Sequence, residues 1–147
     1  MNRADLWKQL EEKKQNERDA VRADYQTTLN SIQKLETHLQ RLDALSEEYR
    51  AQDLKISAEQ HFMSQTQAVR NTIQQIMQLR FKTQYEMDSM RTKLSQIQIS
   101  LQASEVECVK YRKLREQAER QTMLAADKKV RKETDAFALH LHLKHQY

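Results

Sequence analysis

Not one glycine or proline occurs in the 147 residues of this chain. Proline breaks a helix because it lacks a backbone donor and clashes with the preceding turn, and glycine costs about 1 kcal/mol relative to alanine inside one. Turns and strand bends commonly use these two residues. The sequence therefore predicts an all-α fold in which the chain reverses direction very few times.

The apolar residues are too few for a thick globular core. Hydrophobic residues make up 38% of the chain, which has three Phe and one Trp. Such a composition suffices for a narrow seam between two helices. We expect an elongated protein without an enclosed cavity.

In both halves of the chain, seam residues recur at alternating spacings of three and four. The members in the first half are Val21, Tyr25, Thr28, Ile32, Leu35, Leu39, Leu42, Ser46 and Tyr49. Those in the second half are Phe62, Thr66, Val69, Ile73, Ile76, Arg80, Thr83, Met87, Met90, Leu94, Ile97, Leu101, Ser104, Cys108, Tyr111, Arg115 and Ala118. A sustained repeat of about 3.5 residues winds a helix into a left-handed coiled coil with a partner.

One reversal between the two halves predicts a single domain, an antiparallel coiled-coil hairpin over residues 1–147. We expect helix 1 at about residues 3–50, the reversal at about 51–60 and helix 2 at about 61–140. Ser57 is expected to cap the second helix, with Glu59 and Gln60 in its first turn. Because helix 2 is the longer, its last ~30 residues should outrun helix 1 by roughly 45 Å.

Charges interrupt the predicted seam at three places. The stretch KKQNERD (residues 13–19) is polar, so we expect the N-terminal turns with Leu6, Trp7 and Leu10 to be free to bind another molecule. Arg80 and Arg115 also fall on the seam, where a charge costs stability but can fix register or mark a stretch without a partner helix. For Arg115 we expect the absence of a partner helix.

The predicted overhang and its approach are basic. Nine basic and three acidic residues lie between Lys110 and Lys132, a net charge of +6, compared with +4 for the whole chain. A basic helix can bind phosphates, an acidic membrane surface or an acidic protein groove. Because no aromatic residues interleave with these charges and no leucine zipper precedes them, nucleic acid is disfavoured and an acidic protein surface is favoured.

No motif points to an enzyme or to a cofactor. The sequence has no glycine-rich phosphate loop, no nucleophile elbow and no recognisable pair of catalytic carboxylates. His142 and His145 could meet on one helical face to hold a metal, but no Cys or acidic ligand is near, and a frayed polar C-terminus is the favoured interpretation. We predict a protein without enzymatic activity, cofactor or metal.

The ends and the single cysteine bear on localisation. No run of eighteen apolar residues occurs, and the charged start lacks the apolar stretch of a signal peptide. Cys108 cannot form an internal disulfide, which is ordinary in a reducing compartment. We expect a cytoplasmic protein that does not insert into the membrane.

The C-terminal run RKLREQAERQTMLAADKKVRKETDAFAL ends in the tetrad Asp135–Ala138 and the following Leu139. It resembles the end of the flagellar export protein FliJ and of related type III secretion ATPase stalks, which close with a charged stretch and a D-E-F-A-like tetrad. Ala136 stands where that family usually has an acidic residue. The EYR at Glu48–Arg50, before the predicted reversal, and the two-helix layout also agree with the family.

The resemblance implies a component of the flagellar or type III protein export apparatus, cytoplasmic and peripherally associated with the inner membrane. Such a protein enters the hexameric export ATPase as a stalk, contacts the export gate membrane protein and holds empty export chaperones. By this resemblance, the ATPase-contact candidates are Lys128, Lys129, Arg131, Lys132, Asp135 and Phe137. The gate-contact candidates are Val69, Ile73, Ile76 and Arg80.

Two other functions stay open at the level of sequence. The first is a structural spacer or tether that dimerises through its seam, which predicts a dimer where a stalk predicts a monomer. The second is nucleic-acid binding through the basic overhang, which predicts an affinity that falls steeply with salt. The sequence also leaves open whether the export system is flagellar or a virulence-type secretion system.

Overall fold

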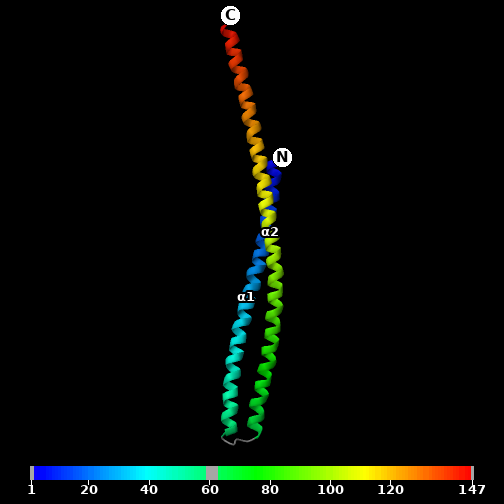
Figure 1. Cartoon of the computed structure of the whole chain (residues 1–147), viewed down its shortest axis with the longest axis vertical. Coiled ribbons are helices and arrows are strands. Elements are labelled where there is room, and N and C mark those ends of the chain that lie inside the picture. The colour runs from blue at the N-terminus through cyan, green and yellow to red at the C-terminus, as the bar shows by residue number, and fades with distance from the viewer. Residues whose placement is uncertain (1, 59–62, 147) are drawn as a thin grey trace. The chain divides into compact units, whose positions relative to one another are not determined.

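The computed structural model describes residues 2–58 and 63–146. It contains two helices, α1 (Arg3–Ala58) and α2 (Met63–His145), which pack against each other (Figure 1). No strand occurs in these two ranges. The all-α prediction is confirmed, and each helix is continuous because no glycine or proline interrupts it.

The first helix has a side-chain cap at its start. Asn2 accepts a hydrogen bond from the Asp5 amide at 2.8 Å through its side-chain oxygen, and its carbonyl accepts one from Leu6 at 3.2 Å. Asparagine at this position satisfies one of the backbone donors that the first turn of a helix leaves unpaired. Asp5 adds a negative charge where the helix dipole favours one.

The position of the first helix end differs from the sequence-based expectation. Residues 51–58 belong to α1, although the reversal was expected at 51–60, and Ser57 lies inside α1 instead of capping the next helix. The segment AQDLKISA contains good helix formers and no breaker, so nothing in it ends the helix. Glu59 and Gln60 lie outside the described residues. At the other end, α2 continues to His145, beyond the expected limit near residue 140.

Contacts divide the chain into two compact units, each made from parts of both helices. Unit 1 combines Met1–Ala20 with Leu101–Tyr147, and unit 2 is Val21–Ser100.

Unit 2 has a narrow apolar core between α1 and α2. Its buried apolar side chains are Ile32, Leu42, Val69, Ile76 and Met87, and Thr28, Ser46 and Thr83 are buried among the same positions. No buried side-chain nitrogen or oxygen in the described residues lacks a hydrogen-bond partner. The core therefore takes in small hydroxyl residues without leaving a polar atom unsatisfied.

Three ion pairs flank this core and show the direction of the two helix segments. Asp53 pairs with Arg70 at 3.4 Å, Asp43 with Arg80 at 2.5 Å and Glu36 with Arg91 at 3.2 Å. The residue number falls along α1 as it rises along α2, so the two segments of unit 2 run in opposite directions. The pairs are largely solvated, and exposed pairs of this kind contribute little stability each, about 0–1 kcal/mol.

The predicted seam coincides with the less exposed positions of both helices. Every predicted seam residue in the described ranges is buried or half-buried except Arg80. Arg80 points out of the seam to Asp43, which explains how a charge is tolerated at this position. Phe62, which was also assigned to the seam, lies outside the described residues.

We predict that the core of unit 2 is sensitive to truncation at Ile76, which is 4% exposed. Ile76→Ala should lower the free energy of unfolding by about 2–4 kcal/mol, because it removes buried methyl groups and leaves a cavity. Ile99→Ala, on the same helix but 68% exposed, is the matched control and should change it by less than about 0.5 kcal/mol. Urea denaturation followed by circular dichroism measures both. Equal effects would contradict the assignment of the core.

Candidate functional site

Unit 1 contains a stretch of α2 that α1 does not cover. Ala118 is the last buried residue of α2, and every residue from 119 to 146 is exposed. Close to Ala118, a groove is lined by residues of both helices, among them Arg3 of α1 and Gln121 of α2. We call Met123–His145 the free segment, and it corresponds to the orange and red end of α2 in Figure 1. It spans roughly 35 Å at 1.5 Å per residue.

All the ATPase-contact candidates lie in the free segment. Lys128, Lys129, Arg131, Lys132, Asp135 and Phe137 are exposed, and Phe137 is 63% exposed. In the described part of the chain, none of the four cations is within ion-pair distance of a carboxylate. Their charges are therefore available to an acidic partner.

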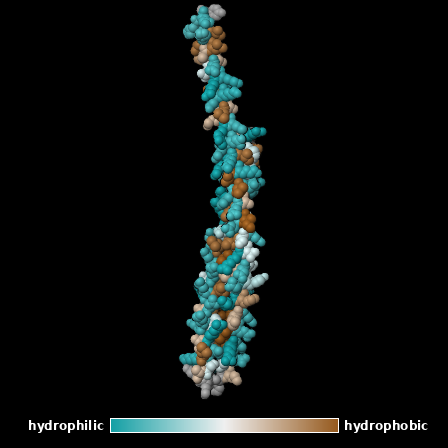
Figure 2. Space-filling model, viewed as in Figure 1, coloured by the Kyte–Doolittle hydropathy of each residue, from teal (hydrophilic) through white to brown (hydrophobic). Residues whose placement is uncertain are grey.

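The apolar side chains of the free segment face more than one side of the helix. At 3.6 residues per turn, Met123, Val130, Phe137 and Leu141 fall within about 40° of one another, and the four cations lie at roughly 100–160° from that stripe. Leu139 and Leu143 project on the side opposite the stripe. Figure 2 shows apolar groups interspersed with polar ones along this end of α2. A partner that buries these apolar groups has to contact the helix from at least two sides.

The N-terminal part of α1 is packed on α2 in unit 1, and the expectation that it is free is wrong. The rings of Trp7 and Tyr111 lie 5.9 Å apart at an angle of 46°. The Lys14 ammonium lies 5.8 Å from the centre of the Tyr111 ring, within cation–π distance. Sequence reasoning missed this packing because the polar stretch KKQNERD lacks the apolar residues that a seam needs.

The expectation that Arg115 marks an absent partner helix is also wrong. Its guanidinium is ion-paired with Glu11 of α1 and lies 3.0 Å from Glu119, one turn further along α2. The Glu11 side chain is only 9% exposed. The hydrogen bond from the guanidinium to Glu11 has the largest effect and raises the pKa of Arg115, and the hydrogen bond to Glu119 raises it further. Removal of the guanidinium from water acts in the opposite direction and is the smaller effect. A guanidinium has several donors in one plane and can serve both carboxylates at once.

The gate-contact candidates lie in unit 2, and half of them are in its core. Val69 is 8% exposed and Ile76 4% exposed, because both face α1. Ile73 is half-buried, and Arg80 is exposed and paired with Asp43. A partner that leaves the two helices together can therefore contact only Ile73 and Arg80 of this set.

Exposed aromatic residues beside Arg80 were not singled out from the sequence. Phe81 is 77% exposed and Tyr85 71% exposed, and Met77, one turn earlier, is 51% exposed. The three residues recur every four positions, so they share one face of α2. A groove of about 510 Å³ beside them is lined by Asp43, Ser46, Glu47, Arg50, Ile76, Met77, Arg80, Phe81 and Gln84. These residues could have been found in the sequence as a row of large apolar residues that does not belong to the seam.

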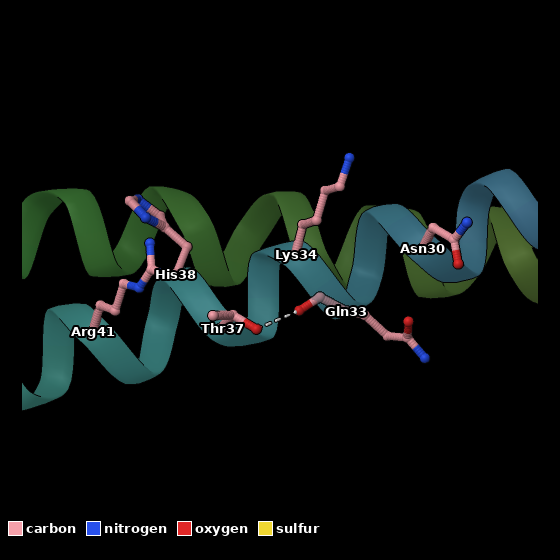
Figure 3. Close-up of a pocket in the computed structure, with 6 residues that line it drawn as sticks. All are labelled: Asn30, Gln33, Lys34, Thr37, His38 and Arg41. Atoms are coloured by element: carbon pink, nitrogen blue, oxygen red, sulfur yellow. Dashed lines mark hydrogen bonds between the residues drawn. The ribbon is translucent and has the colours of Figure 1, made fainter.

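The groove drawn in Figure 3 belongs to one helix face. Its lining residues are Asn30, Gln33, Lys34, Thr37, His38 and Arg41, all from α1. The Thr37 hydroxyl donates a hydrogen bond of 3.1 Å to the Gln33 carbonyl, which is the usual local bond of a threonine inside a helix. With every lining residue on one helix, this is a solvated surface and has no enclosing wall.

The histidines of the C-terminus lie in the last turns of α2. A ring nitrogen of His142 lies 3.2 Å from the side-chain amide of Gln146. No group of three His, Cys, Asp or Glu side chains with metal-binding geometry was found within residues 2–58 and 63–146. In the same two ranges, no helix has a stretch apolar enough and long enough to cross a bilayer.

Comparison with known proteins gives no relative from which function could be transferred. No protein family model, no curated protein and no solved structure matches this chain. Function is therefore proposed from the residues and contacts described above and from the resemblance in the sequence.

We predict that the free segment is the least protected part of unit 1. A helix without tertiary packing is marginally stable, so its amides open more often than those of a packed helix. Residues 123–143 should exchange backbone hydrogen at least about tenfold faster than residues 104–118. Hydrogen exchange with mass spectrometry measures this on the purified protein. Equal protection of the two stretches would mean that another copy or another part of the chain covers the free segment.

Proposed function

We propose that this chain is an antiparallel coiled-coil hairpin that serves as the non-enzymatic stalk of a flagellar or type III export ATPase. In this role it is a cytoplasmic protein, held at the inner membrane only through the export apparatus. The heptad spacing of the less exposed positions and the opposite direction of the segments in unit 2 support the coiled-coil part of the proposal.

The free segment is the observation that carries the proposal. It follows directly on a packed stretch of two helices in unit 1, and it has cations on one side and apolar groups on several sides. A helix that is apolar on more than one side is stable when a partner encloses it. The axis of a protein ring encloses a helix in this way, and acidic groups on the ring would complement the four cations.

The residues that carry the resemblance to FliJ lie in the free segment as well. The tetrad Asp135–Ala138 lies entirely within the free segment, and all four residues are exposed. Lys128, Lys129, Arg131, Lys132, Asp135 and Phe137 are the proposed contacts with the ATPase hexamer. Phe137 supplies a large apolar side chain on the stripe that faces away from the cations, and aromatic side chains are common at the centres of protein interfaces.

We further propose that unit 2 provides the contact with the export gate. Ile73 and Arg80 are the accessible members of the predicted gate face, and the exposed Phe81 extends it along α2. Val69 and Ile76 then act indirectly, because their packing against α1 holds this face in place. The binding of empty export chaperones is proposed from the family resemblance alone.

Charge reversal in the free segment tests the ATPase contact. Changing Lys128, Lys129, Arg131 and Lys132 to Glu together with Phe137→Ala should abolish co-sedimentation with a purified flagellar-type export ATPase. The helical signal should stay within a few per cent, because exposed substitutions perturb stability little. A measurable loss of helix content would point instead to a role of these residues in folding.

A matched variant in unit 2 controls for the change in net charge. Lys34, Arg41, Lys82 and Lys93 changed to Glu, together with Phe81→Ala, alters the same number and types of exposed residues. This variant should bind the ATPase as the unmodified protein does. The proposed contact is wrong if the free-segment variant binds as well as this control, and a protein that sediments alone as a dimer would favour a tether.

A further inference from the structure

The first part of α1 is held on α2 differently from the helices of unit 2. Among its least exposed positions are Glu11, Lys14 and Arg18, where the core of unit 2 has mainly apolar residues. Trp7 and Leu10 are half-buried, and Leu6 is 46% exposed. Hydrophobic burial therefore contributes less at Glu11, Lys14 and Arg18 than in the core of unit 2, and specific contacts have to make up the difference.

Two neighbouring residues of α2 receive those contacts. The Tyr111 ring contacts the Trp7 ring and the Lys14 ammonium. Arg115, one turn later, forms the ion pair with Glu11. Lys110 lies on the Tyr111 ring as well, at 5.6 Å from its centre. The ring and ion-pair contacts of the segment thus meet α2 at two residues that lie one turn apart.

We propose that Arg3–Ala20 is a releasable strap on α2, held mainly by the Glu11–Arg115 ion pair and the Trp7–Tyr111 ring contact. Release of the strap uncovers the side of α2 that carries Ser104, Cys108 and Ala118, and so lengthens the part of α2 without a covering helix. The consequence for function rests on the proposed stalk: Glu11 and Arg115 are positioning residues that set where the segment presented to the ATPase begins.

The burial of Glu11 makes this contact decisive for docking. A carboxylate that is taken out of water is tolerated because the guanidinium neutralises it, and removal of Arg115 would leave the buried Glu11 charge with only a hydrogen bond from Gln15. The attraction is electrostatic, so added salt weakens it where the pair is reached by solvent. The apolar core of unit 2 is not weakened by salt in this way. The strap therefore separates from α2 before the two helices of unit 2 separate from each other.

Cys108 reports whether the strap is docked. It is the only cysteine, it is 7% exposed, and it lies one turn before Tyr111 on α2. The uncovered part of α2 has no buried residue between 119 and 146, so a lone helix does not bury a side chain to this degree. The rate at which a small thiol reagent modifies Cys108 therefore measures the opening of the strap.

The test compares thiol modification of the full chain with that of two neighbouring charge variants. Glu11→Gln should raise the rate at Cys108 by roughly tenfold or more, because the carboxylate no longer holds Arg115. Glu12→Gln removes the same charge from an exposed neighbour and should leave the rate unchanged. If Glu11→Gln reacts no faster than Glu12→Gln, the ion pair does not hold the strap and the proposal is overturned.

A second variant is designed to hold the strap more tightly on α2, without weakening the fold. Arg18→Leu adds an apolar group at a half-buried position of the strap without removing any of its contacts with Tyr111 or Arg115, and should slow modification of Cys108 severalfold. An unchanged or faster rate would overturn the proposal. No ATPase is present in either measurement, so a failure of the strap is distinguishable from a failure of the stalk, which the co-sedimentation experiment detects.

Discussion

Burial of one stripe of side chains on each helix is the interaction on which the rest of the structure depends. A single helix of this composition would be marginal in water, and the paired positions remove its apolar side from solvent. In unit 2 this stripe is apolar with small hydroxyl residues between, and Ile32, Leu42, Ile76 and Met87 are among the least exposed residues. The ion pairs at its edges fix direction and register more than they add stability.

Much of this fold follows from the sequence because both signals involved are strong. The absence of helix breakers predicts continuous helices, and the alternation of three and four predicts which positions are covered. The start of α1 could not be predicted in the same way, since Glu11 and Arg115 look like interruptions of a seam when each is considered alone. Whether Glu11 and Arg115 can pair depends on the register between two segments that are distant in the sequence. The residue pattern within either segment does not determine that register. The end of α1 was misplaced for a simpler reason, because residues 51–58 contain nothing that ends a helix.

The residues of the candidate site also differ in how far the sequence could predict their exposure. The basic charge of the free segment could be read from the sequence, and Phe137 was assigned through the resemblance to FliJ. The gate face was assigned through the resemblance, which does not distinguish the covered side of a helix from its exposed side. Val69 and Ile76, two of its four candidates, are buried, and the exposed Phe81 was not among the candidates.

We propose that the function of this protein depends on the contrast between the covered and the uncovered parts of α2. Up to Ala118, α2 is stabilised by α1, and beyond it the helix offers charge and apolar surface to a partner. Turnover of a purified flagellar-type export ATPase, measured with and without this protein, tests that claim most directly. Stimulated ATP hydrolysis, with both proteins sedimenting together at the size of a ring, is the predicted result. Unchanged hydrolysis with the protein sedimenting separately would contradict it.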